Sequence, residues 1–527
     1  MSPFDRRTFL KGAGLATATF AGTGKAAAIH AAARAKGAKA RKGGAPATRA
    51  ASAPNEIPIP EVPAELTRPL QRRGAGKKIV IAGAGLAGLS AAYELVQAGH
   101  SVTLLEARTR PGGRVFTLRE PFADGLHVDT GANTLPSSHR YVMKYLKQFN
   151  LELIPWLQPE LASLGFIFHM RGVRIRPGDG QGLPYSLSPE EKDMGLPAMV
   201  VKYFMSATAD VGDPLQADWP GAALEALDRQ SIAELMRSRG ATADAVSLLG
   251  LQYYLDLPAE GMYETSSLYL LRDAVLNPES DAIYKIKGGM DLLPRAFAAR
   301  LSDHILYGSP VVRIEQRPAG VEVSFLRNGR TEKIAGDYAL CTLPFSVLKR
   351  VELAPEVSPG KRQAIEGLGY SACTRVFLQC RRRFWMEQKL SGFASTDLPI
   401  AYLFDSTSES AGARGMLEAY IPGPKAREMS ARPEADRMAF ALDQVEKVHP
   451  QVRDYYEGGA CKSWEEDPWA GGAYSYYKPG TVRALHPHVA STEGRLLFAG
   501  EHTSPWPHWM QGALYSGLRA AREINAA

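Results

Sequence analysis

Apolar residues follow two different periodicities just after residue 76. Residues 77–82 form an apolar, β-branched run of strand length, and residues 89–98 have the Ala- and Leu-rich spacing of a helix. Residues 101–106 form a second strand-length run, which ends in an acid. This pattern predicts a strand, a helix and a second strand in close succession, the arrangement of a βαβ unit.

Other elements can be predicted further along the chain. Residues 139–149 and 231–239 repeat apolar positions at helical spacing, so we expect helices within the region 137–280. Residues 310–314 alternate as a strand, and residues 338–344 form another strand that ends at a proline. Strands and helices are therefore mixed along the chain, which favours an α/β fold.

Three glycines, Gly83, Gly85 and Gly88, separate the first predicted strand from the helix in the order G-x-G-x-x-G. The first suits a tight turn, the second lets backbone N–H groups approach a pyrophosphate, and the third lets the helix pack closely on the strand. Glu106 lies 18 residues after Gly88, where a carboxylate can accept hydrogen bonds from ribose hydroxyls. The unit is predicted to bind a dinucleotide, and the residues involved are Gly83, Ala84, Gly85, Leu86, Ala87, Gly88 and Glu106.

The residues after Glu106 indicate which dinucleotide is bound. Glu-Ala-Arg at 106–108 leads on to Pro-Gly-Gly-Arg-Val at 111–115, and this continuation resembles the flavin amine oxidase family. That family contains the monoamine, polyamine and L-amino-acid oxidases. The resemblance implies FAD, and the further residues expected at this part of the cofactor are Ala107, Arg108, Gly113 and Arg114. A second glycine pair with an arginine suits a cofactor that stays bound, whereas a nicotinamide leaves after each turnover.

The resemblance extends to the middle and the end of the chain. Residues 126–132 resemble the family's segment near the flavin ring, and residues 284–293 its return into the FAD domain. Residues 497–503 and 509–521 resemble its closing motif, a Gly-Glu turn followed by a helix. The further FAD-binding residues that this resemblance implies are Val312, Gly500, Glu501 and Met510.

The domain organisation follows from the same comparison. We expect an α/β fold in which a discontinuous, Rossmann-like FAD-binding domain is interleaved with an α+β substrate-binding domain. The expected FAD-binding parts are residues 77–135, 283–350 and 463–527, and the expected substrate-domain parts are residues 136–282, which are helical, and 351–462.

Two aromatic residues are candidates for the walls of the substrate site. Tyr474 matches one wall in the family, and Trp509 stands where many members carry a second tyrosine. Ala473 occupies the position of the cysteine that bonds to FAD in mitochondrial-type monoamine oxidases, so we expect non-covalent FAD. Aromatic walls that disfavour charge would help to deliver a neutral amine.

Two further positions depart from the family pattern. Arg375, a candidate catalytic residue, stands where the family normally has a lysine that holds a water beside the flavin. Arginine does not deprotonate in proteins, so either oxygen reactivity is altered or Arg375 binds an anion such as a substrate carboxylate. Thr134, a candidate substrate-binding residue, stands where L-amino-acid oxidases usually carry an arginine, and a threonine cannot pair with a carboxylate through two parallel bonds.

The resemblance implies an oxidase of a primary or secondary amine. A hydride would pass from the α-carbon to flavin N5, oxygen would re-oxidise the flavin to give hydrogen peroxide, and the imine would hydrolyse. Three alternatives stay open: an L-amino-acid oxidase with a rearranged carboxylate site, an FAD-dependent dehydrogenase or desaturase that uses another acceptor, and a flavin-binding protein without catalysis. A homodimer is one candidate state.

The N-terminus predicts export. Arg6 and Arg7 precede Phe9-Leu10 and a mildly apolar stretch, so residues 1–29 resemble a twin-arginine signal and imply the export machinery of that pathway and a periplasmic or secreted protein. Residues 30–76 are rich in Ala, Lys, Arg, Gly and Pro and are predicted to be a linker or disordered arm.

Charge and cysteine content exclude other classes of protein. Residues 1–76 carry 13 of the 62 basic residues but only 4 of the 55 acidic residues, so the remainder is nearly balanced and offers no basic face for nucleic acid. The four cysteines lack metal-site spacing, so no metal is expected, and Cys373 and Cys380 should face opposite sides of one strand. No stretch after the leader is long and apolar enough to predict a membrane span.

Overall fold

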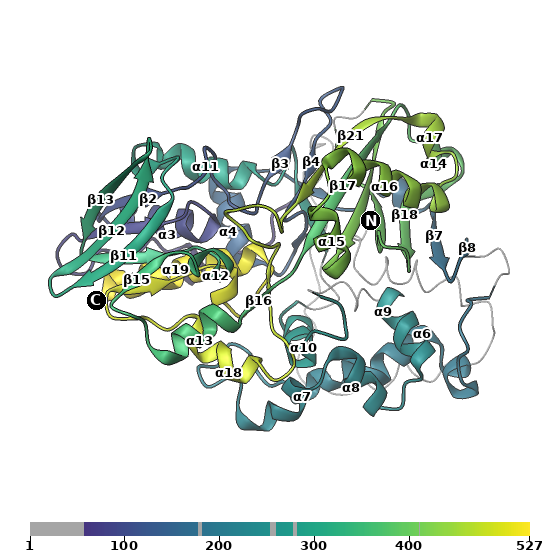
Figure 1. Cartoon of the computed structure of the whole chain (residues 1–527), viewed down its shortest axis with the longest axis horizontal. Helices are drawn as coiled ribbons and strands as arrows, with labels where there is room; N and C mark the ends of the chain where they lie inside the picture. The colour runs from purple at the N-terminus through teal and green to yellow at the C-terminus, as the bar shows by residue number, and fades with distance from the viewer. Residues whose placement is uncertain (1–56, 178–181, 253–259, 278–281, 410–411) are drawn as a thin grey trace, which may run out of the picture.

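A five-stranded parallel sheet carries the predicted βαβ unit (Figure 1). The computed structural model describes residues 57–177, 182–252, 260–277, 282–409 and 412–527. The sheet order is β10 (Ile305–Leu306), β2 (Ser101–Leu105), β1 (Lys78–Ala82), β14 (Tyr338–Cys341) and β23 (Leu496–Phe498). All four pairings are parallel, and β1 is buried at four of its five positions, as expected for a strand covered on both faces.

Helices from the two ends of the described chain cover this sheet together. Helix α3 (Leu86–Gln97) follows β1, and it packs against α19 (Met510–Ala526). Gly517 permits the close approach, because a Cβ there would lie 2.3 Å from the carbonyl oxygen of Ala87. The glycine loop and the C-terminal helix are thereby brought to the same region.

Two further sheets flank this unit (Figure 1). A four-stranded sheet has the order β13 (Arg330–Gly336), β12 (Gly320–Arg327), β11 (Val311–Arg317) and β15 (Glu352–Ala354). A seven-stranded sheet has the order β21 (Tyr456–Ser463), β17 (Cys373–Cys380), β20 (Gly415–Pro422), β19 (Tyr402–Asp405), β18 (Leu390–Thr396), β7 (Gly165–Met170) and β8 (Val173–Ile175). Every residue of β17 is buried, so this strand lies inside the molecule.

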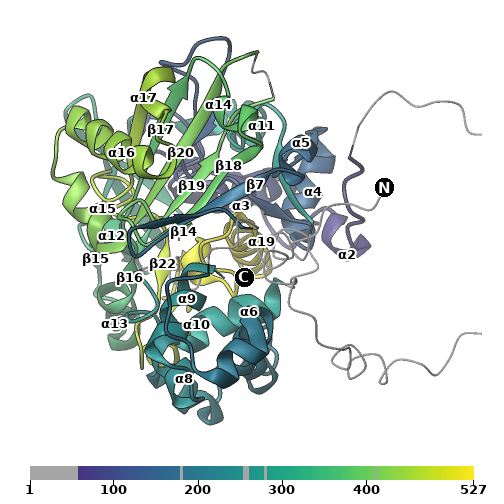
Figure 2. The same cartoon turned by 90° about the vertical axis from the view of Figure 1, so that its right-hand side faces the viewer.

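A group of helices forms a third region, at the lower edge of both views (Figures 1 and 2). It contains α6 (Pro189–Tyr203), α7 (Glu225–Arg229), α8 (Ile232–Ser238), α9 (Ala243–Gln252) and α10 (Ser267–Leu276). Capping boxes fix the starts of α6 and α8: Ser188 pairs with Glu191, and Ser231 pairs with Glu234.

Smaller elements complete the described chain. The remaining α-helices are α2 (Ala64–Thr67), α4 (Arg140–Phe149), α5 (Pro159–Ala162), α11 (Leu292–Arg300), α12 (Phe345–Leu348), α13 (Pro359–Gly367), α14 (Phe384–Glu387), α15 (Gly423–Ser430), α16 (Glu434–Val448), α17 (Val452–Tyr455) and α18 (Val482–Val489). The remaining strands are β3 (Thr117–Leu118), β4 (Val128–Asp129), β5 (Leu135–Pro136), β6 (Leu153–Pro155), β9 (Ile283–Ile286), β16 (Gly369–Tyr370) and β22 (Ser475–Tyr476).

The element predictions agree well with this structure. The strands at 77–82 and 101–106 correspond to β1 and β2, and the helices at 139–149 and 231–239 correspond to α4 and α8. One boundary differs, because α3 begins at Leu86 and not at residue 89. Gly85 adopts an extended conformation and serves as the N-cap, so the glycine loop is shorter than predicted and Gly88 lies in the first turn of the helix.

Part of the segment predicted to be a linker or disordered arm packs on the folded core. Ile57, Ile59, Val62 and Leu70 pack against the core that contains α3 and α4. Their apolar spacing within a Pro-rich stretch is the signal that the composition of the whole segment obscured. Figure 2 shows α2 beside α4, on the side of the molecule where this segment lies.

Membrane-spanning helices and metal-binding clusters are both absent from the described ranges. There, no helix is both long and apolar enough to cross a bilayer. The same residues contain no group of three or more His, Cys, Asp or Glu side chains placed to hold a metal ion. All four cysteines are free thiols, and three of them are buried.

Candidate active site

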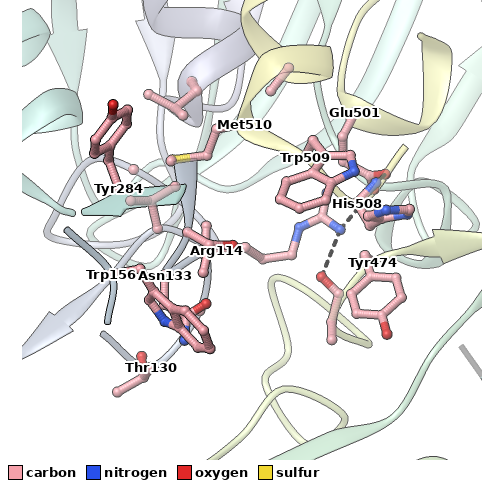
Figure 3. A pocket seen from close by; sticks show the side chains of 18 of the residues that line it. Arg114, Thr130, Asn133, Trp156, Tyr284, Tyr474, Glu501, His508, Trp509 and Met510 are labelled. Atoms are coloured by element: carbon pink, nitrogen blue, oxygen red, sulfur yellow. Dashed lines mark hydrogen bonds and ion pairs between the residues drawn. The ribbon is translucent and has the colours of Figure 1, made fainter. Parts of the chain in front are cut away.

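One large cavity joins the glycine loop to an aromatic pocket. Its volume is about 1800 Å³, well above the roughly 300–1,000 Å³ of ordinary small-molecule pockets. The cavity therefore has room for an extended cofactor and a substrate together. Figure 3 shows part of its lining, with Arg114 and Met510 near the centre and the rings of Tyr474, His508 and Trp509 grouped on one side.

The three glycines of the loop have different surroundings. Gly83 has φ +101°, a conformation that other residues rarely adopt. A Cβ at Gly88 would lie only 2.0 Å from the carbonyl oxygen of Gly83, so the helix could not pack this closely with any other residue. No atom lies within 4 Å of a Cβ built at Gly85, which faces the cavity at the uncapped N-terminus of α3. The loop thus presents open space and free N–H groups where an anion would be stabilised.

Glu106 holds this loop in place through hydrogen bonds to its backbone. Its buried carboxylate accepts hydrogen bonds from the backbone N–H groups of Ala84, at 2.7 Å, and Arg108, at 2.8 Å. Burial raises the pKa of Glu106, while these two hydrogen bonds and the neighbouring arginines oppose that shift. Each carboxylate oxygen keeps a further lone pair, and Glu106 lines the cavity. Arg108 pairs with Asp467 at 2.6 Å.

Arg114 and Glu501 form a second buried connection. An Nη1 of Arg114 donates to Glu501 Oε1 at 2.9 Å and to the carbonyl of Ala473 at 3.1 Å. Glu501 also accepts from the Ser475 hydroxyl at 2.8 Å and from the backbone N–H of His508 at 2.8 Å. Burial opposes ionisation of Glu501, but Arg114 and these donors outweigh it and lower its pKa to about 2. This network holds the start of α19 at the cavity.

Most of the predicted cofactor-binding residues meet at this cavity. Those that line it are Gly83, Gly85, Leu86, Ala87, Glu106, Ala107, Arg108, Gly113, Arg114, Gly500, Glu501 and Met510. Ala84 and Gly88 do not line the cavity. Ala84 donates a hydrogen bond to Glu106, and Gly88 packs against the carbonyl of Gly83. Val312 lies on β11, in the four-stranded sheet, and is not among the lining residues.

Arg375 lines the cavity, and its charge is already paired with that of a buried carboxylate. Its Nε donates to Glu418 at 2.6 Å and its Nη1 donates to the carbonyl of Gly131 at 2.6 Å. Glu418 in turn accepts from the Ser406 hydroxyl at 2.5 Å. Both charged side chains are at most 4% exposed. Burial opposes the charge on Arg375, yet Glu418 keeps its pKa above the ordinary value. These contacts oppose the hypothesis that Arg375 binds a substrate carboxylate.

A histidine lies against both predicted aromatic walls. The ring centroid of His508 is 5.6 Å from that of Tyr474 and 5.3 Å from that of Trp509. Asp273, on α10, accepts a hydrogen bond from Trp509 Nε1 at 2.7 Å. Nδ1 of His508 lies 2.7 Å from the hydroxyl oxygen of Tyr269. The wall is thus built from the cap of α19, from the segment before β22, and from α10.

The cavity also has many apolar and aromatic lining residues. They include Trp156, Phe204, Leu270, Phe404 and Tyr420. The predicted substrate-binding residue Thr134 is half-buried and lines the same cavity. Apolar walls of this kind disfavour a charged ligand and favour a neutral one.

Sequence reasoning missed His508, Asp273 and Glu418. Glu418 could have been found, because it is a lone acid in the otherwise apolar strand β20 and Arg375 needs a buried partner. Asp273 lies on a helix far from the flavin motifs in sequence, and only the fold brings it to Trp509. His508 directly precedes a predicted site residue, yet no pattern marked its side chain.

The donor set fits a dinucleotide cofactor. Two uncapped helix N-termini, those of α3 and α19, open into one cavity together with the open space at Gly85. The buried acid at the end of β2 completes the arrangement that a ribose and a pyrophosphate require. The fold and the site thus define a cofactor-dependent oxidoreductase with a mixed α/β architecture.

The chain belongs to the family described as flavin containing amine oxidoreductase, whose profile matches residues 86–525. It is 31% identical over 461 residues to an L-amino-acid oxidase of Siganus canaliculatus, and the match covers 85% of each chain. It is 30% identical over 477 residues to the flavin-dependent L-tryptophan oxidase RebO of Lentzea aerocolonigenes, covering 85% of this chain and 98% of that one. The fold is similar to that of wild-type putrescine oxidase bound to putrescine, with a TM-score of 0.74, 20% identity and coverage of 86% and 100%.

Proposed function

We propose that this flavoenzyme is an FAD-dependent oxidase of a primary or secondary amine. The observation that carries the proposal is the single cavity that runs from the glycine loop to the wall of Tyr474, His508 and Trp509. One end suits the diphosphate of a dinucleotide, and the other suits an uncharged, apolar ligand. Membership of the amine oxidoreductase family supports the same reaction class.

The proposed cofactor is FAD, held without a covalent bond in a Rossmann-like domain. Support comes from Glu106, which lies at the end of β2 where a ribose is bound in dinucleotide folds. Ala473 offers no thiol at the position where some relatives bond to the cofactor. Cys373 is the cysteine that lines the cavity, and burial raises its pKa to about 11, so it stays a thiol and a poor nucleophile.

The residues of the pocket would prepare the amine for oxidation. When bound, the flavin supplies the acceptor for a hydride from the α-carbon of the substrate. An ammonium nitrogen has no lone pair to assist that transfer, so the site must favour the neutral amine. Tyr474, Trp509 and the apolar lining around Trp156 do so, because an uncompensated ammonium loses its hydration there.

Anaerobic reduction of the flavin tests this proposal. The purified yellow protein is mixed without oxygen with a panel of primary amines, secondary amines and L-amino acids, and the loss of flavin absorbance is followed. We expect several amines to bleach the flavin. A flavin that no member of the panel bleaches would overturn the proposed function.

A second candidate function is oxidation of an L-amino acid. The observation that favours it is the identity of about 30% to curated L-amino-acid oxidases. Against it stand Thr134 and the pairing of Arg375, since the cavity then lacks the arginine that would bind a carboxylate. Matched pairs separate the two candidates: 2-phenylethylamine against L-phenylalanine, and tryptamine against L-tryptophan. Faster reduction by both amino acids would favour the second candidate.

The electron acceptor is proposed to be oxygen. Dehydrogenation or desaturation with another acceptor is the alternative, and it draws support from Arg375, whose guanidinium is fixed by Glu418 and cannot act as the family's lysine does. The test measures hydrogen peroxide per turnover with and without an artificial acceptor. One peroxide per substrate supports an oxidase, whereas turnover only with the added acceptor supports a dehydrogenase.

We also propose export by the twin-arginine pathway to the periplasm or beyond. Arg6 and Arg7 carry this proposal, and a tightly held cofactor gives a reason to export the folded protein. Replacing both arginines by lysine should retain yellow, active protein in the cytoplasm of a bacterial host. Unchanged export of the double variant would exclude this route.

A further inference from the structure

His508 combines a costly backbone conformation with a position in the cavity wall. It has φ +59°, in the left-handed region, and it directly precedes the N-cap of α19. Only glycine adopts this conformation without strain, although histidine tolerates it better than bulky residues do. Strained residues of this kind gather at functional sites, where surrounding contacts hold them. A side chain is present here although the backbone would favour having none.

The imidazole is held on both edges. Nδ1 lies 2.7 Å from the Tyr269 hydroxyl, and Nε2 lies 3.3 Å from Asp273 Oδ1. The Tyr269 hydroxyl also donates to the carbonyl of Ser475 at 3.0 Å, so it can accept a hydrogen bond from Nδ1–H. The backbone N–H of His508 donates to Glu501. The ring therefore has one fixed orientation and cannot swing away from the cavity.

Asp273 holds this histidine and the neighbouring wall together. Its Oδ1 accepts hydrogen bonds from Trp509 Nε1 at 2.7 Å and from Asn277 Nδ2 at 2.6 Å. The same oxygen lies 3.3 Å from His508 Nε2. His508 and Trp509 are thus fixed on one anchor, and the His508 side chain is still 17% exposed toward the cavity that it lines. Its ring lies against both aromatic walls, with its centroid 5.6 Å from that of Tyr474 and 5.3 Å from that of Trp509.

We propose that His508 is a specificity-determining residue that limits the width of the substrate pocket between Tyr474 and Trp509. The substrate class follows: the site takes amines with a slim, unbranched substituent beside the reacting carbon and excludes those with a bulky branched group. This inference rests on the proposed function, because it concerns the substrate of the same cavity. The strain at His508 is retained because a glycine would leave this part of the pocket open.

Replacing His508 by glycine tests the proposal without imposing new backbone strain. Steady-state turnover is measured with a slim amine, n-hexylamine, and a bulky one, 2,2-diphenylethylamine. In His508→Gly the ratio of kcat/KM for the bulky amine to that for the slim amine should rise at least about tenfold, the scale on which pocket size discriminates. Most of the gain should appear as a lower KM for the bulky amine, since the change removes a steric barrier to its binding.

Two further variants make the result interpretable. His508→Asn keeps a residue that accepts positive φ but has a smaller side chain, so its ratio should lie between those of the wild type and the glycine variant. Asn328→Gly relieves a positive φ, +50°, in the turn between β12 and β13, away from the cavity, and its ratio should match the wild type.

The two possible failures differ in their signature. A ratio within about threefold of the wild type in both His508 variants, with slim amines still oxidised, overturns the role of His508 and leaves the proposed function intact. A wild-type flavin that no amine reduces overturns the proposed function and this inference with it. If His508→Gly does not retain flavin, the asparagine variant decides between the outcomes.

Discussion

The arginines that line the cavity are each neutralised by a carboxylate. The pairs are Arg108–Asp467, Arg114–Glu501 and Arg375–Glu418, at 2.6, 2.9 and 2.5 Å. A buried ion pair is costly to break and contributes little net charge to its surroundings. The described lining therefore offers no unpaired guanidinium to an anionic ligand. The pairing of these arginines favours an amine over an amino acid as the substrate.

Replacing Glu418 should destabilise the fold, because it leaves a buried arginine without its counter-ion. In Glu418→Gln, Arg375 loses its counter-ion, and the free energy of unfolding should fall by about 3–5 kcal/mol, measured by urea denaturation. The double variant Arg375→Gln/Glu418→Gln should recover part of this loss, because it leaves no uncompensated charge. Equal stability of the single variant and the wild type would show that the pair is not coupled.

Arg375→Gln alone separates structural support from recognition of the substrate. We expect its kcat/KM to fall by a similar factor for 2-phenylethylamine and L-phenylalanine, since Glu418 and Gly131 already occupy the guanidinium. A loss at least about tenfold greater for the amino acid, or about 1.4 kcal/mol, would instead assign a carboxylate-binding role to Arg375.

Glu501 should make the fold sensitive to acid. Its pKa is about 2 in the folded protein against an ordinary value of 4.5, so its contribution is complete above about pH 4.5 and is lost as the pH falls toward 2. Between pH 6 and pH 3 the wild type should lose about 2 kcal/mol more unfolding free energy than Glu501→Gln, measured in urea. Glu332→Gln, at an exposed position on β13, should behave as the wild type, and an identical pH dependence in Glu501→Gln would refute the assignment.

At the scale of elements, the local sequence pattern was enough to predict β1, α3 and β2. It was not enough to predict the order of strands in the seven-stranded sheet. The glycines and the apolar runs of the βαβ unit carry their own turn and packing signals within about thirty residues. In contrast, β7 lies beside β18 although more than 200 residues separate them, and such a pairing leaves no local signature. The same reason explains the site: Tyr474 and Trp509 belong to sequence motifs, whereas Asp273 reaches them only because α10 packs there.

The glycine loop permits a direct test of which position serves the fold and which serves the cofactor. Gly88→Ala places a methyl group against the Gly83 carbonyl, so the flavin-free protein should lose about 1–3 kcal/mol of unfolding free energy. Gly85→Ala meets no protein atom, so the flavin-free protein should keep its stability. Its affinity for FAD should fall at least about tenfold, because the methyl group displaces a charged hydrogen bond worth about 1.5–3 kcal/mol.

Gly221→Ala is the matched control for Gly85→Ala. Gly221 has φ −70° and ψ 170°, against −72° and 175° for Gly85, and its Cβ would also meet nothing within 4 Å. Calorimetry of the flavin-free proteins and titration with FAD give both quantities. Equal affinity for FAD in the two alanine variants would show that Gly85 does not contact the cofactor.

At the scale of the whole molecule, distant segments enclose one cavity. The parallel sheet supplies the glycine loop, the seven-stranded sheet supplies Arg375 and Glu418, and the helical region supplies Asp273. The segment at residues 57–70 adds Ile57 and Ile59 to the lining and packs against the core beside α4. A part of the chain predicted to be a linker thus contributes to the enclosure of the site.

Removal of this segment should weaken both the fold and cofactor retention. A protein that starts at residue 57 keeps four packed apolar side chains, the hydrogen bond from Arg140 to the Glu61 carbonyl and that from Asn525 to the Gln71 carbonyl, each 2.8 Å long. A protein that starts at residue 77 lacks them and should lose about 2–4 kcal/mol of unfolding free energy. It should also release FAD faster on dilution, because Ile57 and Ile59 no longer cover the cavity. Glu65→Ala in the longer protein alters an exposed residue of the same segment and should change neither property. Identical stability and flavin release in the two truncated proteins would mean that residues 57–76 rest on the surface without supporting it.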